Sequence, residues 1–384
     1  MKPAKILITG ATGFIGARLC EILTLERGTP YRALVRNFTR AARIARLDAE
    51  MIAGDLRDPS VLAEALAGCD AVVHLAHSDD RTAAKETRNL VVACQRARIR
   101  RFVHVSSMAV HGPAPQPKVL TETTAPIQRW GEPYSDAKAQ SEAVVASAIE
   151  KKFPAVILRP TVVYGPYSYF ITPIIDHARE GRVCLIDGGR GLCNAVYVDD
   201  VCDAILAALD TERAVGRTFF VNGDDRLTWG EFIHAFARLT GRPTRTCDHS
   251  VEEIRTHWRA KRPTLASNVR ALVRLAASPS LHAELSTVPA VGALLRGTKE
   301  LLAGAVSEEH KWMLKGRLQG APRAPAPTTS QGPGVPNESR VVREAYRSWV
   351  SNARAKQELG WRPRTPFARG AELTGAWLQF ARMV

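Results

Sequence analysis

The sequence lacks the features by which membrane-spanning, metal-binding and disulfide-bonded proteins are usually recognised. No stretch reaches 18 uninterrupted apolar residues, so we expect no membrane-spanning helix. The seven cysteines form no CxxC pair, and Cys184, Cys193 and Cys202, nine residues apart, fit no metal-ligand spacing. We therefore expect no metal site and no disulfide framework. The first residues lack the long apolar run of a signal peptide, which predicts a cytoplasmic protein.

The charge of the chain is unbalanced but not gathered into runs. Lys and Arg number 53 against 38 Asp and Glu, a net charge of +15, yet no run of five like charges occurs. No zinc-finger or helix-turn-helix spacing is present, so we expect no nucleic-acid partner. A basic protein can still meet phosphorylated small molecules or anionic lipid, and the alternative is a basic surface that serves solubility.

Short apolar runs alternate with helical patterns over the first 160 residues. The predicted strands are Ile6–Thr9, Tyr31–Val35, Met51–Ala53, Ala71–Leu75, Phe102–Val105 and Ala155–Leu158. The predicted helices between or after them are Phe14–Arg27, Pro59–Ala67, Ala83–Ala97 and Tyr134–Lys152. Strands that alternate with helices imply βαβ units, and hence an α/β fold with a doubly wound parallel sheet covered on both faces.

A glycine-rich turn joins the first predicted strand to the first predicted helix. Gly10 permits a tight turn, Gly13 lets the backbone approach a pyrophosphate, and Gly16 lets the helix pack closely on the sheet. The free N–H groups at the helix start then face the phosphates. This context predicts a Rossmann-type dinucleotide site that includes Gly10, Thr12, Gly13, Phe14, Ile15 and Gly16.

The second predicted strand ends on a basic residue that bears on cofactor choice. An acidic residue there would accept hydrogen bonds from the adenosine ribose, whereas Arg36 suits a 2′-phosphate. The sequence thus favours NADP, with NAD as the alternative.

The predicted helix that follows Pro133 begins with a YxxxK motif. The spacing of four residues places Tyr134 and Lys138 on one face of the helix. A nearby ammonium group lowers the pKa of a phenol from its usual value of about 10. Tyr134 could then exchange a proton with a substrate hydroxyl or carbonyl near neutral pH.

The TGATGFIG turn and the YxxxK motif together resemble the extended short-chain dehydrogenase/reductase family, the NAD-dependent epimerase/dehydratase group. The resemblance covers about residues 5–240 and 350–380. It implies that Ser107, at the end of the fifth strand, orients the reacting oxygen, and that Tyr134 and Lys138 act with it as the catalytic set. It also implies cofactor contacts from Asp55 and Leu56, Leu75 and Ala76, Tyr134 and Lys138, Pro160 and Val163. His77 stands where the family has a small residue, and we expect a surface or capping role for it.

The pattern changes after residue 165. A strand at Thr218–Val221 and helices at Asp199–Leu209, Trp229–Leu239, Ser351–Leu359 and Ala371–Phe380 are predicted. We expect a nucleotide-binding domain over residues 1–165, to which 195–222 return. Residues 166–194 and 223–384 would form a smaller, mostly helical substrate domain.

Residues 255–340 carry 13 Lys and Arg against 5 Asp and Glu and form the least regular stretch. Within it, 320–336 holds five Pro and three Gly, which predicts a disordered loop. The apolar runs with scattered basic residues over 269–306 suggest either a helical cap over the active site or weak contact with a membrane surface.

Three functions compete at this point. The first is a nucleotide-sugar epimerase or ketoreductase that works by tyrosine-assisted hydride transfer, as the resemblance implies. The alternative is an NADPH-dependent reductase or dehydrogenase of a hydrophobic, steroid-like or flavonoid-like alcohol or ketone. A non-catalytic NADP-binding regulator is the third. The resemblance also implies a homodimer.

Overall fold

The computed structural model describes residues 4–112, 118–124, 127–261 and 335–384. The chain divides into two compact units: Met1–Val251 with Pro336–Val384, and Glu252–Val335. The segment 269–306 and nearly all of the loop predicted at 320–336 lie outside the described residues. The domain boundaries predicted at residues 165 and 222 stay a prediction.

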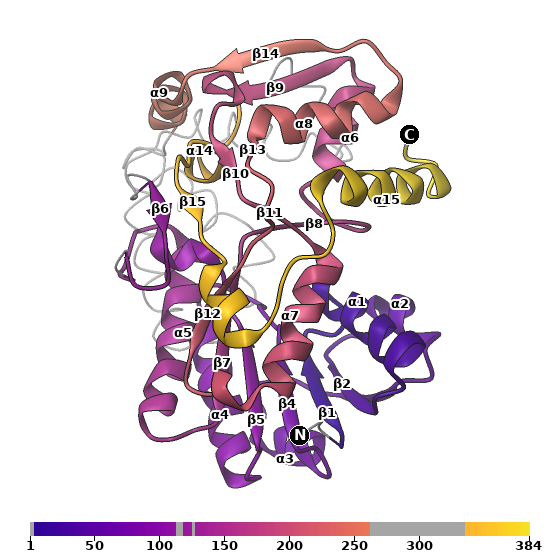
Figure 1. Ribbon diagram of the computed structural model, residues 1–384, viewed down its shortest axis with the longest axis vertical. Coiled ribbons are helices and arrows are strands. Elements are labelled where there is room, and N and C mark those ends of the chain that lie inside the picture. The colour runs from indigo at the N-terminus through magenta and orange to yellow at the C-terminus, as the bar shows by residue number, and fades with distance from the viewer. Residues whose placement is uncertain (1–3, 113–117, 125–126, 262–334) are drawn as a thin grey trace, which may run out of the picture. The chain divides into compact units, whose positions relative to one another are not determined.

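The first unit is built on a seven-stranded sheet in which every described pairing is parallel (Figure 1). Its order is β12 (Thr218–Val221), β7 (Ala155–Pro160), β5 (Arg101–Val105), β4 (Ala71–His74), β1 (Ile6–Thr9), β2 (Tyr31–Val35) and β3 (Glu50–Ala53). The chain starts at the centre, moves to one edge, and then returns past β1 to build the other half. The predicted α/β fold with a doubly wound parallel sheet is confirmed.

Alternate residues of the central strands enter two separate cores, one on each face of the sheet. On β1, Ile6 and Ile8 join the first core, whereas Leu7 joins the second. On β5, Val103 joins the first and Phe102 the second. Successive side chains of a strand point to opposite faces, so a strand buried on both faces is apolar throughout.

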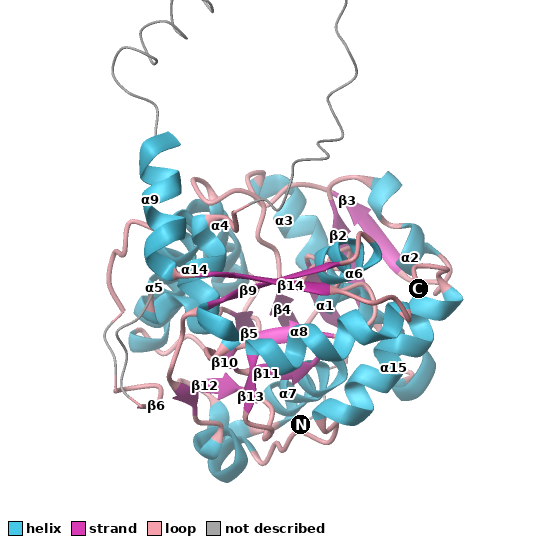
Figure 2. Ribbon diagram, turned by 90° about the horizontal axis from the view of Figure 1, so that it is seen from above, coloured by secondary structure: helices cyan, strands magenta, loops and turns pink. Residues whose placement is uncertain are grey.

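Helices cover both faces of the sheet (Figures 1 and 2). The first core is covered by α1 (Phe14–Ile22), α2 (Ala42–Ala45) and α7 (Val198–Asp210). The second core is covered by α3 (Pro59–Leu66), α4 (Ala83–Arg96) and α5 (Pro133–Glu150). The helix predicted over Phe14–Arg27 is confirmed in its bounds: α1 covers Phe14–Ile22 and continues as a π-helical turn over Leu23–Arg27, which is capped by Gly28 in the left-handed conformation.

Short elements lie beyond the carboxyl ends of the main strands (Figure 1). They pair as β8 (Val162–Tyr164) with β11 (Ala195–Tyr197), β9 (Arg182–Ile186) with β14 (Arg245–His249), β10 (Leu192–Cys193) with β13 (Leu227–Thr228), and β6 (Val119–Leu120) with β15 (Trp349–Val350). The helices here are α6 (Thr172–Arg179), α8 (Trp229–Ala237), α14 (Glu338–Glu344) and α15 (Phe367–Phe380). Helix α9 spans Val251–Lys261, and all of it after Val251 belongs to the second unit.

The helix predicted over Ser351–Leu359 begins two residues later than predicted. Ala353 and Arg354 are α-helical, and Ala355–Leu359 continues as a π turn. Asn352 instead donates hydrogen bonds from its side chain to the Asn222 carbonyl at 2.8 Å and to Asp224 at 2.7 Å. Those bonds to a distant segment hold the backbone in a loop, which a local pattern does not reveal.

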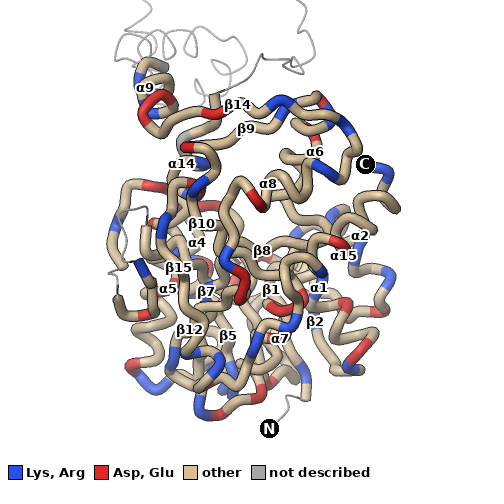
Figure 3. The backbone as a smooth tube through the Cα atoms, turned by 45° about the horizontal axis from the view of Figure 1, so that its top comes forward, with Lys and Arg blue, Asp and Glu red and all other residues tan. Residues whose placement is uncertain are grey.

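Basic and acidic positions are interspersed along the described elements (Figure 3). Much of the net positive charge belongs to residues 255–340, most of which are not described. In the part of the chain that the structure describes, no helix is both long and apolar enough to cross a membrane.

Candidate active site

A cavity of about 470 Å³ opens at the carboxyl ends of the central strands. It lies where β1 has β4 on one side and β2 on the other, the point at which strand order reverses. Doubly wound sheets bind their ligands at this point. The sequence-predicted residues that line the cavity are Gly10, Gly13, Phe14, Ile15, Gly16, Leu75, Ser107, Tyr134, Lys138, Pro160 and Val163.

The glycine turn is shaped by close backbone contacts. Gly10 has a φ of +76°, and an added Cβ would lie 2.7 Å from the backbone nitrogen of Ala76. A Cβ on Gly16 would lie 2.2 Å from the Gly10 carbonyl oxygen. Gly13 is exposed and lines the cavity. The first and third glycines therefore close the turn, and the second leaves backbone open to a ligand.

The first backbone N–H groups of helix α1 have no side-chain cap. Its N-cap residue is Gly13, and no side chain caps the helix. The first N–H groups of a helix lack partners within it, and they carry the positive end of the helix dipole. Phe14 and Ile15, the first two residues of α1, line the cavity. These residues fit a dinucleotide pyrophosphate.

The other predicted cofactor residues lie outside the cavity lining. Arg36 is exposed directly after β2, and Asp55 follows β3, the neighbouring strand. The guanidinium of Arg57 hydrogen-bonds Asp55 and, with a smaller effect from Arg36, lowers the pKa of that carboxyl. Leu56 is 5% exposed and packs in the second core. Thr12 is half-buried, as is Ala76, whose backbone contacts the glycine turn.

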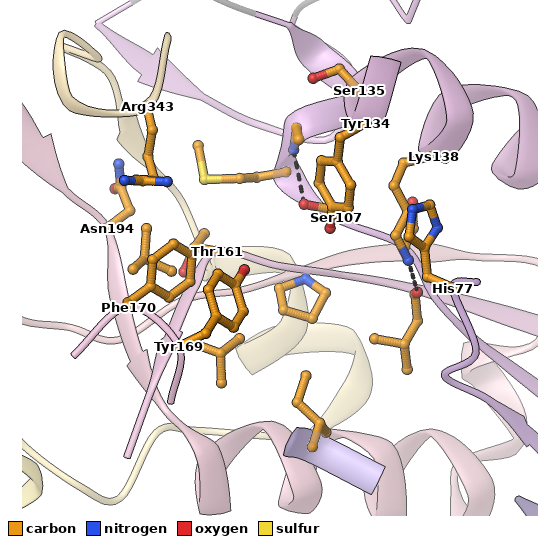
Figure 4. A pocket seen from close by; sticks show the side chains of 18 of the residues that line it. His77, Ser107, Tyr134, Ser135, Lys138, Thr161, Tyr169, Phe170, Asn194 and Arg343 are labelled. Atoms are coloured by element: carbon orange, nitrogen blue, oxygen red, sulfur yellow. Dashed lines mark hydrogen bonds between the residues drawn. The ribbon is translucent and has the colours of Figure 1, made fainter. Parts of the chain in front are cut away.

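The start of helix α5 places the YxxxK pair. Glu132 caps the helix by accepting hydrogen bonds from the backbone of Tyr134 and Ser135, and Pro133 occupies the first turn. Lys138 is 7% exposed, and its Nζ donates to the Val105 carbonyl oxygen at 3.1 Å. That bond ties α5 to the end of β5, where Ser107 stands (Figure 4).

Ser107 and Tyr134 face each other across this corner of the cavity (Figure 4). Ser107 caps a short 3-10 helix (Met108–His111), since its Oγ accepts a hydrogen bond from the Ala109 backbone at 3.2 Å. Ser107 and Tyr134 both line the cavity, and the Ser107 side chain lowers the pKa of the Tyr134 phenol. The structure therefore brings Ser107, Tyr134 and Lys138 together beside the glycine turn.

The electrostatics of the pair differ from the sequence-based expectation. Burial lowers the pKa of Lys138 to about 8, and Glu142 opposes that shift. The pKa of the Tyr134 phenol is raised, not lowered: desolvation by the surrounding groups is the main cause, the Tyr169 phenol adds to it, and the Ser107 side chain opposes it. The residue as a whole is 38% exposed. The expectation that Lys138 lowers the pKa of Tyr134 is therefore not met by the protein side chains alone.

A buried network of charged side chains lies next to Ser107, Tyr134 and Lys138, which we call the catalytic corner. Ser106 donates to Glu142, and Glu142 pairs with Arg159. Arg159 also lies 2.9 Å from the Nε2 of His111, which is fully buried. These buried contacts hold His111 and Ser106 in the interior, and the next serine, Ser107, lines the cavity.

The opposite wall comes from segments that the sequence motifs did not indicate. Tyr169 and Phe170 precede α6, Asn194 lies between β10 and β11, and Arg343 belongs to α14 (Figure 4). The guanidinium of Arg343 lies 5.0 Å from the Phe170 ring centre. Met108, Val342, Leu192 and Tyr346 also line the cavity. No local pattern marks these residues, because each reaches the cavity only through the tertiary fold.

His77 is the clearest correction to the residue-level expectations. It follows β4 and lines the cavity, whereas a surface or capping role was expected. Its ring contacts the Tyr134 ring edge-on, with centres 5.2 Å apart and planes at 77°. The departure from a small residue, seen in the sequence, was the available indication.

Comparison with known proteins shows which family the chain belongs to. The model of the NAD dependent epimerase/dehydratase family matches residues 6–221, more than half of the chain. A 4-hydroxy-2-methyl-3-oxo-4-farnesyl-3,4-dihydroquinoline-1-oxide ketoreductase of Stigmatella aurantiaca is 33% identical over 223 residues, which cover 55% of this chain and 66% of that protein. A 2-alkyl-3-oxoalkanoate reductase of Stenotrophomonas maltophilia is 28% identical over 264 residues, 62% of this chain and 76% of that protein.

Solved structures agree on the fold. The UDP-glucose 4-epimerase of Thermotoga maritima, crystallised with UDP-glucose, has a TM-score of 0.65 at 18% identity and covers 98% of this chain and 99% of that chain. At that identity the likeness concerns the fold. The match of the family model to more than half of the chain shows that the chain belongs to the NAD-dependent epimerase/dehydratase family, and with the named relatives it shows an oxidoreductase-type enzyme of the extended short-chain dehydrogenase/reductases.

Proposed function

We propose that the protein is an NADPH-dependent ketoreductase that acts on an apolar ketone. The observation that carries the proposal is the apolar lining of the cavity, to which Met108, Tyr169, Phe170 and Val342 contribute. An apolar wall favours binding of an apolar ligand, because burial removes apolar surface from water. It offers few hydrogen bonds to a sugar ring, whose buried hydroxyl groups need partners. This function is the second of the three that the sequence suggests, the NADPH-dependent reductase of a hydrophobic ketone.

The names of two relatives support the same substrate class. The Stigmatella aurantiaca and Stenotrophomonas maltophilia relatives are a ketoreductase and an oxoalkanoate reductase. Both names describe reduction of a carbonyl group. We extend this to the present chain as part of the proposal.

The roles of the catalytic side chains follow from their positions. Tyr134 would give its hydroxyl proton to the substrate carbonyl oxygen, and the Ser107 hydroxyl would hold that oxygen by a hydrogen bond. With its pKa at about 8, Lys138 carries a proton at pH 7, so its charge offsets the phenolate left on Tyr134. Bound NADPH supplies the hydride. The glycine turn and the open start of α1 would hold its pyrophosphate.

NADPH is proposed over NADH on the strength of Arg36. It is exposed at the carboxyl end of β2, and a 2′-phosphate pairs well with a guanidinium. Asp55, the carboxylate on the neighbouring strand end, is already engaged by Arg57. A cytoplasmic location and a homodimer stay predictions.

The test is turnover of a ketone panel with NADPH. Ethyl 2-methyl-3-oxobutanoate and an aromatic ketone represent the proposed class, and NADPH absorbance reports the reaction. The Tyr134→Phe variant should lose about 100-fold or more in kcat, since general acid catalysis contributes about 10²–10⁴-fold. Tyr167→Phe is the matched control, because Tyr167 is 50% exposed and packs on Trp377 outside the cavity. Equal turnover by Tyr134→Phe would remove the tyrosine mechanism, and NADPH binding without turnover of any substrate would favour the regulator.

A nucleotide-sugar epimerase is the second candidate, and one residue favours it. The guanidinium of Arg343 lines the cavity and could pair with a diphosphate. Incubation with UDP-glucose and NAD, followed by chromatography of the sugar products, distinguishes the two. Epimerised sugar without ketone turnover would replace the proposed function.

A further inference from the structure

His77 connects the catalytic tyrosine to a carboxylate at the surface. Its ring contacts Tyr134 edge-on, and its Nε2 lies 2.8 Å from a carboxylate oxygen of Asp80. Because a carboxylate accepts, Nε2 carries the hydrogen in this contact and the other ring nitrogen, Nδ1, keeps its lone pair when the ring is neutral. The pair thus has the geometry of a carboxylate-oriented histidine base.

Lys138, His77 and Asp80 differ in how much of each side chain is exposed to solvent. Lys138 is buried, and its Nζ is bound to the Val105 carbonyl. The side chain of His77 is 23% exposed and that of Asp80 is 38% exposed. Exposure therefore increases from the catalytic lysine through the histidine to Asp80. In Figure 4 the His77 ring lies next to the Lys138 side chain, away from Tyr169 and Phe170.

We propose that His77, oriented by Asp80, is a relay residue that returns protons from solvent to Tyr134 after each turnover. The proposal rests on the proposed reductase function, because it supplies the proton that reduction consumes. His77 acts through Tyr134 and does not itself protonate the substrate.

The protons balance over one cycle. In the chemical step the O–H bond of Tyr134 breaks, its proton goes to the carbonyl oxygen, and the hydride adds to the carbonyl carbon. The neutral His77 ring takes up a proton from bulk water on Nδ1, and the resulting imidazolium gives that proton to the phenolate on Tyr134, which restores the neutral ring with its N–H on Nε2. The net change is one hydride and one proton consumed for each alcohol formed.

The charges around His77 leave it able to titrate. Burial lowers the pKa of His77, and the Lys138 ammonium lowers it further, whereas Asp80 and, more weakly, Glu86 raise it. Tyr134 is in ring contact, and Asp79 bonds to Arg81. A mostly neutral imidazole that can take up and release a proton is what a relay needs near neutral pH.

The experiment compares two substitutions of His77 in the full-length enzyme, with ethyl 2-methyl-3-oxobutanoate and NADPH. His77→Ala removes the relay and leaves space, and His77→Phe keeps a ring against Tyr134 but carries no proton. We expect both to lower kcat by about 10- to 100-fold with little change in KM. Added imidazole should restore activity to His77→Ala, and the limb of the kcat–pH profile on which activity falls with rising pH, as His77 loses its proton, should move in both variants.

The carboxylates give a matched pair of controls. Asp80→Asn should lower kcat in the same direction as His77→Ala, whereas Asp79→Asn, one residue away and bonded to Arg81, should leave it unchanged. Full activity of His77→Phe, or a loss in His77→Ala that imidazole does not rescue and that leaves the pH profile unmoved, would overturn the relay while the reductase function stands. Absence of ketone turnover by the wild-type enzyme would overturn both proposals.

Discussion

Two histidine rings are buried side by side in the central sheet, and they make the fold sensitive to acid. His74 on β4 and His104 on β5 are register partners, both 2% exposed, with ring centres 5.3 Å apart. Thr9 and Thr87 hydrogen-bond the two ring nitrogens of His74 at 2.7 and 3.1 Å. Neither nitrogen of His104 has a partner among the described residues.

Burial lowers the pKa of both rings, to about 3 for His74 and well below 6.5 for His104. A folded-state pKa that is depressed means that only the unfolded chain takes up the proton as pH falls below 6.5. Stability is therefore present above pH 6.5 and is lost below it. The 1.5 pH units between 6.5 and 5, at about 1.4 kcal/mol per unit, amount to about 2 kcal/mol for each ring.

The perturbation is His104→Leu, which replaces the unpartnered ring by an apolar side chain. At pH 7 we expect the variant to be at least as stable as wild type, because two unsatisfied buried nitrogens are removed. On acidification to pH 5, the free energy of unfolding should favour the variant by about 2 kcal/mol more than at pH 7. Urea denaturation followed by tryptophan fluorescence at the two pH values measures this difference.

The difference between variant and wild type isolates His104 from other titrating groups. Asp200, for example, has its pKa raised to about 6 by burial, and so it stabilises the fold as pH falls. That contribution, like that of His74, is common to both proteins and cancels. An identical gap at pH 7 and pH 5 would refute the reasoning, because it would mean that the folded protein protonates His104 as readily as the unfolded chain.

Two further predictions concern the cofactor site. Gly16→Ala should raise the KM for NADPH at least tenfold and lower the melting temperature, because its Cβ would lie 2.2 Å from the Gly10 carbonyl oxygen. Gly230→Ala, whose added Cβ would make only ordinary contacts, the nearest at 3.5 Å, is the control, and equal KM values for both would contradict the prediction. Arg36→Ala should weaken NADPH binding about tenfold, the loss of one charge-assisted contact, and leave NADH nearly unchanged, as measured by fluorescence titration; a parallel loss for both cofactors would count against the 2′-phosphate contact.

Local patterns determined the parts of this protein that are built from neighbouring residues. Alternation of apolar runs with helical stretches gave the central strands to within a residue or two, because strands buried on both faces must be apolar. The glycine turn and the YxxxK spacing each lie within a few residues, so their geometry follows from one strand, one turn or one helix. Ser107 was placed by family resemblance, and the structure does bring it beside Tyr134.

Only the tertiary structure decided which residues surround Ser107, Tyr134 and Lys138 in the cavity. Arg343 is more than 200 residues from Tyr134 in the sequence, and Phe170 belongs to yet another segment, so no periodicity links them to the cavity. The raised pKa of Tyr134 and the place of His77 were likewise set by packing, since burial and ring contact arise only when β4 and α5 come together. The sequence gives the chemical type of each side chain. Its solvation and its neighbours are set only when segments that are far apart in the sequence pack against one another.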